Sequence, residues 1–509
     1  MERRLFLSSA LATGGALVAS GALAQNGTQR QETPQTSTIL ASPQASTDAI
    51  DDLVQYMVGT SAGALPDRAL ATTRSQLLDA LGVGLGGGHE DGVRQLREIA
   101  TEVGGKRESV VWGTALRLPA HDAARINAAM VHALEFDDTF GPGFLHPSAI
   151  TFPAALAVAD LVGGVSGKEF LAACTLAIDV ACRIAVSGEP GVDGFATGWH
   201  NTTLVGYISS ALLAARLMAL DRDQTINAAG LAYHQAAGNA QAHIDGALAK
   251  RLGPGFASAA GIMAARLAAR GVTGARNVLE GEKGWYRQYH RGLYSRELLL
   301  GGLGTVFAAE EVSYKPWPSC RGSHTSVDAA LHIVAAHGLR AENIERVVLR
   351  NGPAEYPFLS TPIDRKRRPR TSVDAQFSIP WIVAAALVDR KVSIAQFKPE
   401  ALDRPDIKRM VDRITPVLDD SLANPAGGPG QAQIDVTTSD GRVFSKRVVT
   451  AKGGLEAPMT DAEVEAKFRD CVEYGGLPNA QAVEIRALAL DVAALDDVSR
   501  LTKSMTVSA

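Results

Sequence analysis

The strongest constraint on the fold is a long run of helical periodicity. Between residue 51 and about residue 300, apolar side chains recur at spacings of three and four, as Leu77, Leu78 and Leu81 illustrate. This spacing places apolar side chains on one face of a helix. The chain also contains 50 Gly residues and only 6% aromatic residues, which favours closely packed helices over an aromatic-rich β-sandwich. The sequence therefore predicts helices stacked on helices over this region.

The pattern changes after residue 314. Residues 344–349 have the composition of a strand, and residues 434–444 read as a β-hairpin that turns at Asp440-Gly441. Further on, residues 460–463 (T-D-A-E) form a capping box that starts another helix. These features predict a smaller α+β domain followed by C-terminal helices, which we expect to pack back on the first domain.

The first residues have the features of an export signal. Arg3 and Arg4 are followed by L-F-L, a mildly apolar stretch and the sequence A-L-A before Gln25. This arrangement resembles a twin-arginine signal peptide, and its apolar stretch is far shorter than the roughly 20 residues that span a membrane. We therefore expect the mature protein to be periplasmic and to start at Gln25. No later segment reads as a membrane span, so no membrane association is expected after removal of the signal.

The whole chain is predicted to be mainly α, with a large all-helical domain and a smaller α+β lid domain. Residues 1–24 are the twin-arginine-type signal, and residues 25–47, rich in Gln, Thr, Ser and Pro, are a disordered linker. Residues 48–310 form the helical domain, which the C-terminal helices of residues 456–509 join. Residues 311–455 form the α+β lid.

Charge and composition exclude several classes of function. The chain has 50 basic and 54 acidic residues, a net charge of −4, so it lacks the broad basic surface that nucleic-acid binding requires. None of its glycine clusters follows a strand with the spacing of a phosphate loop. Its four cysteines form no C-x-x-C pair for zinc or an iron–sulfur cluster. The expected partner is therefore a small molecule.

The most informative segment is residues 132–149. Glu135, Asp137 and Asp138 are predicted to crowd the last turn of one helix, where the partial negative charge of the helix end should make at least one carboxylate more basic than a free acid. Such a group suits a general base. His146 then precedes Pro147, the predicted first residue of the next helix. The N-terminus of a helix carries partial positive charge and stabilises a bound anion. A structural cap is the alternative, and His132 with Glu135 could instead hold a metal.

Two further segments place a histidine at the start of a predicted helix. His200 precedes an apolar helix, and His324 ends a segment that leads into another. Three histidines in matching contexts suggest one shared site. Arginine offers a planar fork for a carboxylate and lysine a point charge. Lys315 and Arg321 lie in the segment before His324, and Lys250 and Arg251 form a further cationic pair before an Ala-rich helix, where plain surface charge is the alternative.

Taken in this order, the segments resemble the MmgE/PrpD family. The resemblance is carried by H-A-L-E-F-D-D-T with the following H-P-S, by G-W-H-N-T, by D-G-x-x-A-K-R-L-x-P-G, by K-P-W-P-x-C-R-G-S-H and by D-A-Q-F-S-I-P. It implies a large all-helical domain with a smaller α+β lid, usually as a homodimer. It also implies lyase or isomerase chemistry on small polycarboxylates, with neither cofactor nor metal.

Carried over by position, the resemblance assigns two sets of residues to one pocket. The expected substrate-binding residues are Glu135, Thr139, Lys250, Arg251, Lys315 and Arg321. The expected catalytic residues are Asp137, His146, His200 and His324. Glu135 stands where the family's decarboxylases have Asp. Our hypothesis is that the cations hold substrate carboxylates while Asp137 and His146 move a proton, which gives a dehydratase or decarboxylase. An epimerase, or a periplasmic polycarboxylate-binding protein without turnover, is the alternative.

Overall fold

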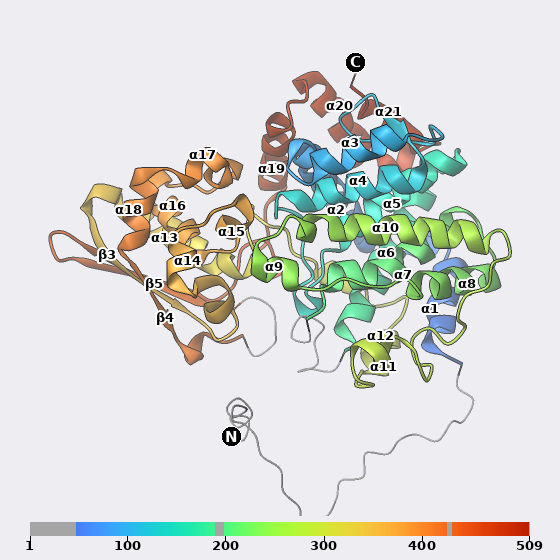
Figure 1. Cartoon of the computed structure of the whole chain (residues 1–509), viewed down its shortest axis with the longest axis horizontal. Coiled ribbons are helices and arrows are strands. Elements are labelled where there is room, and N and C mark those ends of the chain that lie inside the picture. The colour runs from blue at the N-terminus through green and yellow to red at the C-terminus, as the bar shows by residue number, and fades with distance from the viewer. Residues whose placement is uncertain (1–46, 189–197, 425–429, 508–509) are drawn as a thin grey trace, which may run out of the picture. The chain divides into compact units, whose positions relative to one another are not determined.

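The computed structural model describes residues 47–188, 198–424 and 430–507 (Figure 1). The expected signal, residues 1–24, lies outside the described residues, as does all but the last residue of the expected linker. Among the described residues, no helix combines the length and the apolar character needed to cross a membrane.

The first element begins where the sequence predicted the folded part to start. Helix α1 (Ala49–Gly59) follows its N-cap Asp48, whose side chain accepts a hydrogen bond from the backbone N of Ile50. The same carboxylate accepts from the backbone N of Leu279 and Glu280 at 3.2 and 2.7 Å. Asp48 therefore caps α1 and also fixes it to a segment more than 200 residues away.

Helices packed on helices make up the part before residue 310, as predicted. They are α2 (Asp67–Gly86), α3 (Val93–Val103), α4 (Ala120–Ala133), α5 (Pro147–Val162), α6 (Gly167–Val186), α7 (Asn201–Leu217), α8 (Arg222–Tyr233), α9 (Gln241–Asp245), α10 (Ala249–Ala268), α11 (Trp285–Tyr289) and α12 (Arg296–Leu300). A strand pair that the sequence did not predict, β1 (Ser109–Val110) with β2 (Arg117–Leu118), interrupts them. Strands of two residues are too short to show an alternating pattern.

Small residues allow the central helices to approach closely. Helix α10 packs against both α4 and α7 (Figure 1). A Cβ atom on Gly255 of α10 would lie 2.3 Å from the carbonyl oxygen of Arg125 on α4. A Cβ on Gly261 would lie 2.7 Å from the backbone N of Ala211 on α7. The glycine-rich composition thus sets the distances between these helices.

A four-stranded sheet forms the core of the second part. The strands are β3 (Ile344–Asn351), β4 (Ile414–Leu418), β5 (Ala432–Thr438) and β6 (Val443–Val448), in the order β4-β3-β5-β6. Strand β3 pairs parallel with β4 and antiparallel with β5, and β5 pairs antiparallel with β6. The predicted strand and hairpin are therefore confirmed, and Gly441 takes the positive φ of 83° at the turn.

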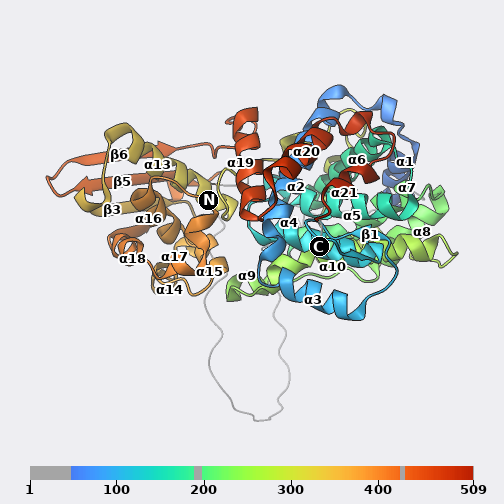
Figure 2. The same ribbon diagram turned by 90° about the horizontal axis from the view of Figure 1, so that it is seen from above.

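Helices lie against one face of this sheet (Figure 2). Helices α13 (His324–His337), α16 (Ile379–Asp389) and α18 (Pro405–Asp412) contact its strands, whereas α14 (Ile363–Arg367), α15 (Ser372–Gln376) and α17 (Pro399–Leu402) pack on these helices or on one another. Residues of β5 alternate between buried and half-buried, as expected when one face of a sheet is covered. The apolar residues of this part form a core cluster separate from that of the helical part.

The C-terminal helices return to the helical part, as predicted. They are α19 (Asp461–Tyr474), α20 (Asn479–Leu490) and α21 (Ser499–Ser504). Thr460 and Glu463 form the expected capping box at the start of α19. Phe468 of α19 packs so closely on α2 that a Cβ on Gly82 would lie 2.8 Å from its ring. Apolar residues of all three helices therefore belong to the core of the helical part.

Candidate active site

The loop after α4 carries the acidic residues of the site. Helix α4 ends at Ala133, and Glu135 adopts a left-handed backbone conformation with a φ of 53°. A residue in this conformation terminates a helix. Asp137 and Asp138 therefore lie in the connection that follows and not in the last helical turn, where the sequence analysis expected them.

Side chains from three distant segments bind the carbonyl groups at this helix end. The pairs, donor first, are Gln376 Nε2 to Leu134 O at 2.8 Å, Lys315 Nζ to Glu135 O at 3.1 Å and Lys467 Nζ to Phe136 O at 2.7 Å. Carbonyl groups at a helix C-terminus have no partner within the helix. These bonds satisfy them, and they also tie the α+β part and α19 to the loop.

Asp137 lies between two histidines. Its Oδ2 is 2.6 Å from His132 Nδ1 and 3.5 Å from His146 Nδ1. Burial alone would raise the pKa of Asp137, but its interactions with His132, His146 and Lys315 hold that pKa well below its usual value. Burial lowers the pKa of both histidines. At neutral pH the group is therefore an ionised carboxylate beside two neutral imidazoles.

Two buried lysines balance the charges of Glu135 and Asp137. Lys250 forms an ion pair with Glu135, and Lys315 Nζ lies 3.7 Å from Glu135 Oε2 and 3.8 Å from Asp137 Oδ1. Burial alone would raise the pKa of Glu135, but the charges of both lysines hold it below its usual value. The sequence analysis placed Lys250 ahead of a helix, whereas it lies in the first turn of α10.

Asp138 differs from the other two acids. Its Oδ2 lies 2.5 Å from Ser148 Oγ, and its Oδ1 accepts a hydrogen bond from Ser148 N at 3.2 Å. Burial, together with the nearby charges of Asp79 and Asp137, raises the pKa of Asp138 to about 8. One carboxylate, Asp138, therefore has a raised pKa, as expected, but burial and not the crowding of acids is the main cause. Asp137, expected to move a proton together with His146, is instead more acidic than a free aspartate.

The histidines of the helical part lie side by side. The ring centre of His132 is 4.8 Å from that of His146 and 5.6 Å from that of His200. His146 and His200 are the N-caps of α5 and α7, which confirms their predicted place at helix starts. Thr139 Oγ1 lies 3.4 Å from His146 Nδ1, so Thr139 joins this group.

Arg321 and His324 form a second pair, which is linked to these residues by the charge of Lys315 acting on His324. Arg321 Nη1 is 3.0 Å from His324 Nδ1, and both side chains are buried. Burial, and then the charges of Arg321 and Lys315, lower the pKa of His324 well below its usual value. These residues are called here the polar cluster: His132, Glu135, Asp137, Thr139, His146, His200, Lys250, Lys315, Arg321 and His324. Contacts join the first eight, and the charge of Lys315 links Arg321 and His324 to them.

Arg251 faces away from the polar cluster. Its guanidinium donates to Asp91 O at 2.9 Å and lies 3.3 Å from Glu90 Oε2. Both partners belong to the segment that leads into α3. Although Arg251 follows Lys250 directly in α10, its positive charge therefore balances another part of the molecule.

Three residues that shape the site, His132, Gln376 and Lys467, were not among the predicted site residues. His132 was predicted only as a metal ligand with Glu135, but the left-handed Glu135 folds the loop so that Asp137 contacts His132. Gln376 and Lys467 contact partners 242 and 331 positions away. No local pattern in the sequence indicates such contacts.

Three residues of the cluster could geometrically surround a metal ion. His132, Asp137 and His146 each offer a ligand atom, and these atoms lie within 4.8 Å of one another. A metal ligand must be deprotonated, whereas His132 Nδ1 and Asp137 Oδ2 share a proton at 2.6 Å and the Lys315 ammonium lies 3.8 Å from the other Asp137 oxygen. This arrangement suits acid–base chemistry better than metal binding.

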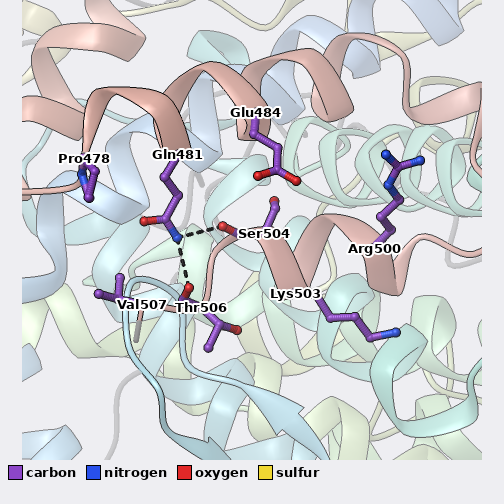
Figure 3. Close-up of a pocket in the computed structure, with 8 residues that line it drawn as sticks. All are labelled: Pro478, Gln481, Glu484, Arg500, Lys503, Ser504, Thr506 and Val507. Atoms are coloured by element: carbon purple, nitrogen blue, oxygen red, sulfur yellow. Dashed lines mark hydrogen bonds between the residues drawn. The ribbon is translucent and has the colours of Figure 1, made fainter. Parts of the chain in front are cut away.

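Two surface hollows lie outside the polar cluster. One, formed mainly by α20 and α21, is lined by Glu484, Arg500 and Lys503, and within it Gln481 Nε2 donates to Ser504 O and Thr506 O (Figure 3). The other lies beside the aromatic rings of Trp199, Tyr233 and Tyr289. Neither is lined by a residue of the cluster. Within the cluster, His146 has the most exposed side chain, at 14%.

Comparison with known proteins identifies the family of the chain. Residues 51–296 match the MmgE/PrpD N-terminal domain, and residues 317–491 match the MmgE/PrpD C-terminal domain. Human cis-aconitate decarboxylase is 28% identical over 424 residues, which cover 81% of this chain and 85% of the human protein. Cis-aconitate decarboxylase of Aspergillus terreus is 26% identical over 398 residues, 74% of this chain and 80% of that protein. The 2-methylcitrate dehydratase of Cupriavidus necator is 25% identical over 479 residues, 88% of this chain and 94% of the dehydratase. The chain belongs to the MmgE/PrpD family.

Proposed function

We propose that the chain is a cofactor-independent lyase, a dehydratase or decarboxylase, that acts on a small di- or tricarboxylate. Similarity to proteins named as a decarboxylase and a dehydratase supports lyase chemistry of the MmgE/PrpD type. One structural observation supports the proposed type of chemistry and substrate. Neutral histidines and a buried cation without a carboxylate partner lie in the same cluster, which supports acid–base chemistry on an anion.

Arg321 is the cation of the cluster that we propose binds the anionic substrate. Among the described residues, Lys250, Lys315 and Lys467 each form an ion pair with a carboxylate, whereas the guanidinium of Arg321 contacts backbone oxygens and His324. Its Nε is buried and has no hydrogen-bond partner in the part of the chain that the structure describes. Burial lowers the pKa of Arg321 to about 10, so it stays charged at neutral pH.

The free donors of Arg321 match the shape of a carboxylate. Nη1 uses its two hydrogens on Lys452 O and His324 Nδ1, and Nη2 donates one of its two to Ala451 O. One hydrogen on Nε and one on Nη2 remain for a ligand, and these two nitrogens share one edge of the planar guanidinium. Two parallel donors of this kind bind a carboxylate bidentately. We therefore assign a substrate carboxylate to this edge.

The histidines of the cluster offer opposite proton states. A carbonyl oxygen can only accept, so His146 donates its Nδ1 hydrogen to Asp138 O at 2.7 Å and keeps a lone pair on Nε2. A guanidinium can only donate, so His324 accepts at Nδ1 and carries its hydrogen on Nε2. In a dehydration, a lone-pair nitrogen removes the proton beside the substrate carboxylate, and an N–H group donates a hydrogen bond to the departing hydroxide.

A substrate panel tests this function. Purified protein is incubated with cis-aconitate, citrate and 2-methylcitrate, each with and without a chelator, and the products are followed by NMR. We expect turnover of at least one acid at a rate the chelator does not change. Binding without turnover of any acid would indicate a binding protein, and loss of activity in the chelator would indicate a metal enzyme. Either result would contradict the proposal.

The location and assembly of the protein are also proposals. The R-R-L-F-L start supports export to the periplasm, and intact-mass analysis of the exported protein should give Gln25 as its first residue. We further propose that the protein is a homodimer, as the resemblance to its family implies. Light scattering should then give twice the mass of the mature chain, and a monomer mass would contradict the assembly.

A further inference from the structure

His132 occupies the centre of the polar cluster. It lies in the last turn of α4, its side chain is fully buried, and its ring contacts those of His146 and His200. Its Nδ1 is 2.6 Å from Asp137 Oδ2. The ring is therefore held by a charge-assisted hydrogen bond, which is shorter and stronger than a bond between neutral groups.

This bond fixes the tautomer of His132. An ionised carboxylate can only accept, so the hydrogen of the neutral ring lies on Nδ1, and Nε2 carries the lone pair. Nε2 is buried and has no hydrogen-bond partner among the described residues. A buried polar atom without a partner is rare in folded proteins and needs an explanation. A proton delivered by a bound molecule would satisfy this nitrogen.

We propose that His132 is a catalytic base whose Nε2 takes the proton from the carbon beside the substrate carboxylate, with Asp137 as its positioning residue. The inference rests on the proposed lyase function and narrows it to reactions that begin with proton removal. The C–H bond breaks and an N–H bond forms on Nε2, while the electron pair delocalises into the carboxylate bound at Arg321. The electron pair then expels hydroxide from the next carbon, and the Nε2 hydrogen of His324 donates a hydrogen bond to this hydroxide. The hydroxide takes the proton held on Nε2 of His132 and leaves as water.

The contacts of His132 favour it over His146 as the base. A ring that accepts a proton becomes a cation, and an adjacent carboxylate stabilises this cation more than a neutral carbonyl group does. Asp137 is 2.6 Å from His132, whereas it is 3.5 Å from His146, whose Nδ1 hydrogen bonds to the carbonyl oxygen of Asp138. His146 is also the most exposed side chain of the cluster, which places it at the approach of the substrate.

The tautomer can be tested without any substrate. The side-chain nitrogens of ¹⁵N-labelled histidine are observed by long-range correlation NMR, and the resonances of His132 are identified from their absence in His132→Asn. We expect Nε2 of His132 to carry no hydrogen in the native protein. In Asp137→Asn the new amide can donate to Nδ1, so the hydrogen should move to Nε2. A protonated Nε2 in the native protein would overturn the proposal, whatever the substrate proves to be.

Substitution tests the chemical step. His132→Asn keeps an amide donor toward Asp137 but removes Nε2, and His332→Asn makes the same change at an exposed histidine. With the acid that the substrate panel identifies, His132→Asn should lower kcat by about 10²–10⁴-fold and change KM little, whereas His332→Asn should match the native enzyme. The double variant with Asp137→Asn should be no slower than either single variant, because the two residues act as one unit.

Two kinetic results would overturn the role of His132. One is a kcat for a folded His132→Asn protein, checked by its circular dichroism, that lies within about threefold of native. The other is a fully additive loss in the double variant. If no acid is turned over, the proposed lyase function fails, while the NMR result still decides the tautomer on its own. If His132→Asn does not fold, Asp137→Asn still tests the base, because its flipped tautomer should lower kcat.

Discussion

Replacing Asp138 with Asn should make the protein less sensitive to alkaline pH. The carboxyl group is buried beside Ser148, and its pKa is raised from 3.8 to about 8. A group whose pKa is higher in the folded than in the unfolded chain contributes stability that is complete below about pH 4 and is lost as the pH rises through about 8. Each unit of difference corresponds to about 1.4 kcal/mol, so between pH 5 and pH 8 the native protein should lose about 4 kcal/mol that the Asn variant keeps.

Urea unfolding at several pH values between 5 and 8 measures this difference. Asn has the shape of a protonated Asp and can keep both contacts with Ser148, and the other titrating groups are the same in both proteins, so the difference isolates Asp138. The same substitution at Asp403, whose side chain is 90% exposed, should follow the native protein. An Asp138→Asn variant whose free energy of unfolding changes with pH in parallel with the native protein would refute the reasoning.

Three further substitutions test the site and the packing. Arg321→Lys should raise KM by about 10- to 100-fold with little change in kcat, because lysine cannot offer two parallel donors; unchanged steady-state kinetics would remove this side chain from substrate binding. Gly255→Ala should lower the free energy of unfolding by about 1–3 kcal/mol, because its Cβ would lie 2.3 Å from Arg125 O; urea unfolding identical to native would contradict this packing. Lys467→Met should cost about 3–5 kcal/mol by leaving Asp79 buried without its partner at 2.7 Å, and Asp79→Leu in the same chain should restore part of the loss. A double variant no more stable than Lys467→Met would contradict the ion-pair argument.

Local patterns predicted the elements and the helix starts of the site. Apolar spacing indicated the long helices, the Asp440-Gly441 turn indicated the hairpin, and the capping box at Thr460 indicated α19. His146 and His200 were placed correctly at helix starts because the position of a helix start depends on a few neighbouring residues. Each of these features depends on interactions within a short stretch of chain, which the sequence displays directly.

The charge distribution of the site could not be predicted in the same way. Lys250 and Arg251 are neighbours in sequence, yet α10 turns one toward Glu135 and the other toward Glu90. Asp137 and Asp138 are also neighbours, yet one is made acidic by contacts with His132 and Lys315 and the other basic by burial beside Ser148. These outcomes depend on which distant side chain arrives at each position, and only the folded chain supplies that information.

The central claim is that a small acid binds within the polar cluster with one carboxylate on Arg321. A crystal structure of the protein with bound 2-methylcitrate or cis-aconitate tests it most directly. We expect a carboxylate on the Nε and Nη2 edge of Arg321, with the adjacent carbon facing Nε2 of His132. An acid bound in the hollow beside Gln481, or against Trp199, with the cluster unchanged, would contradict the account.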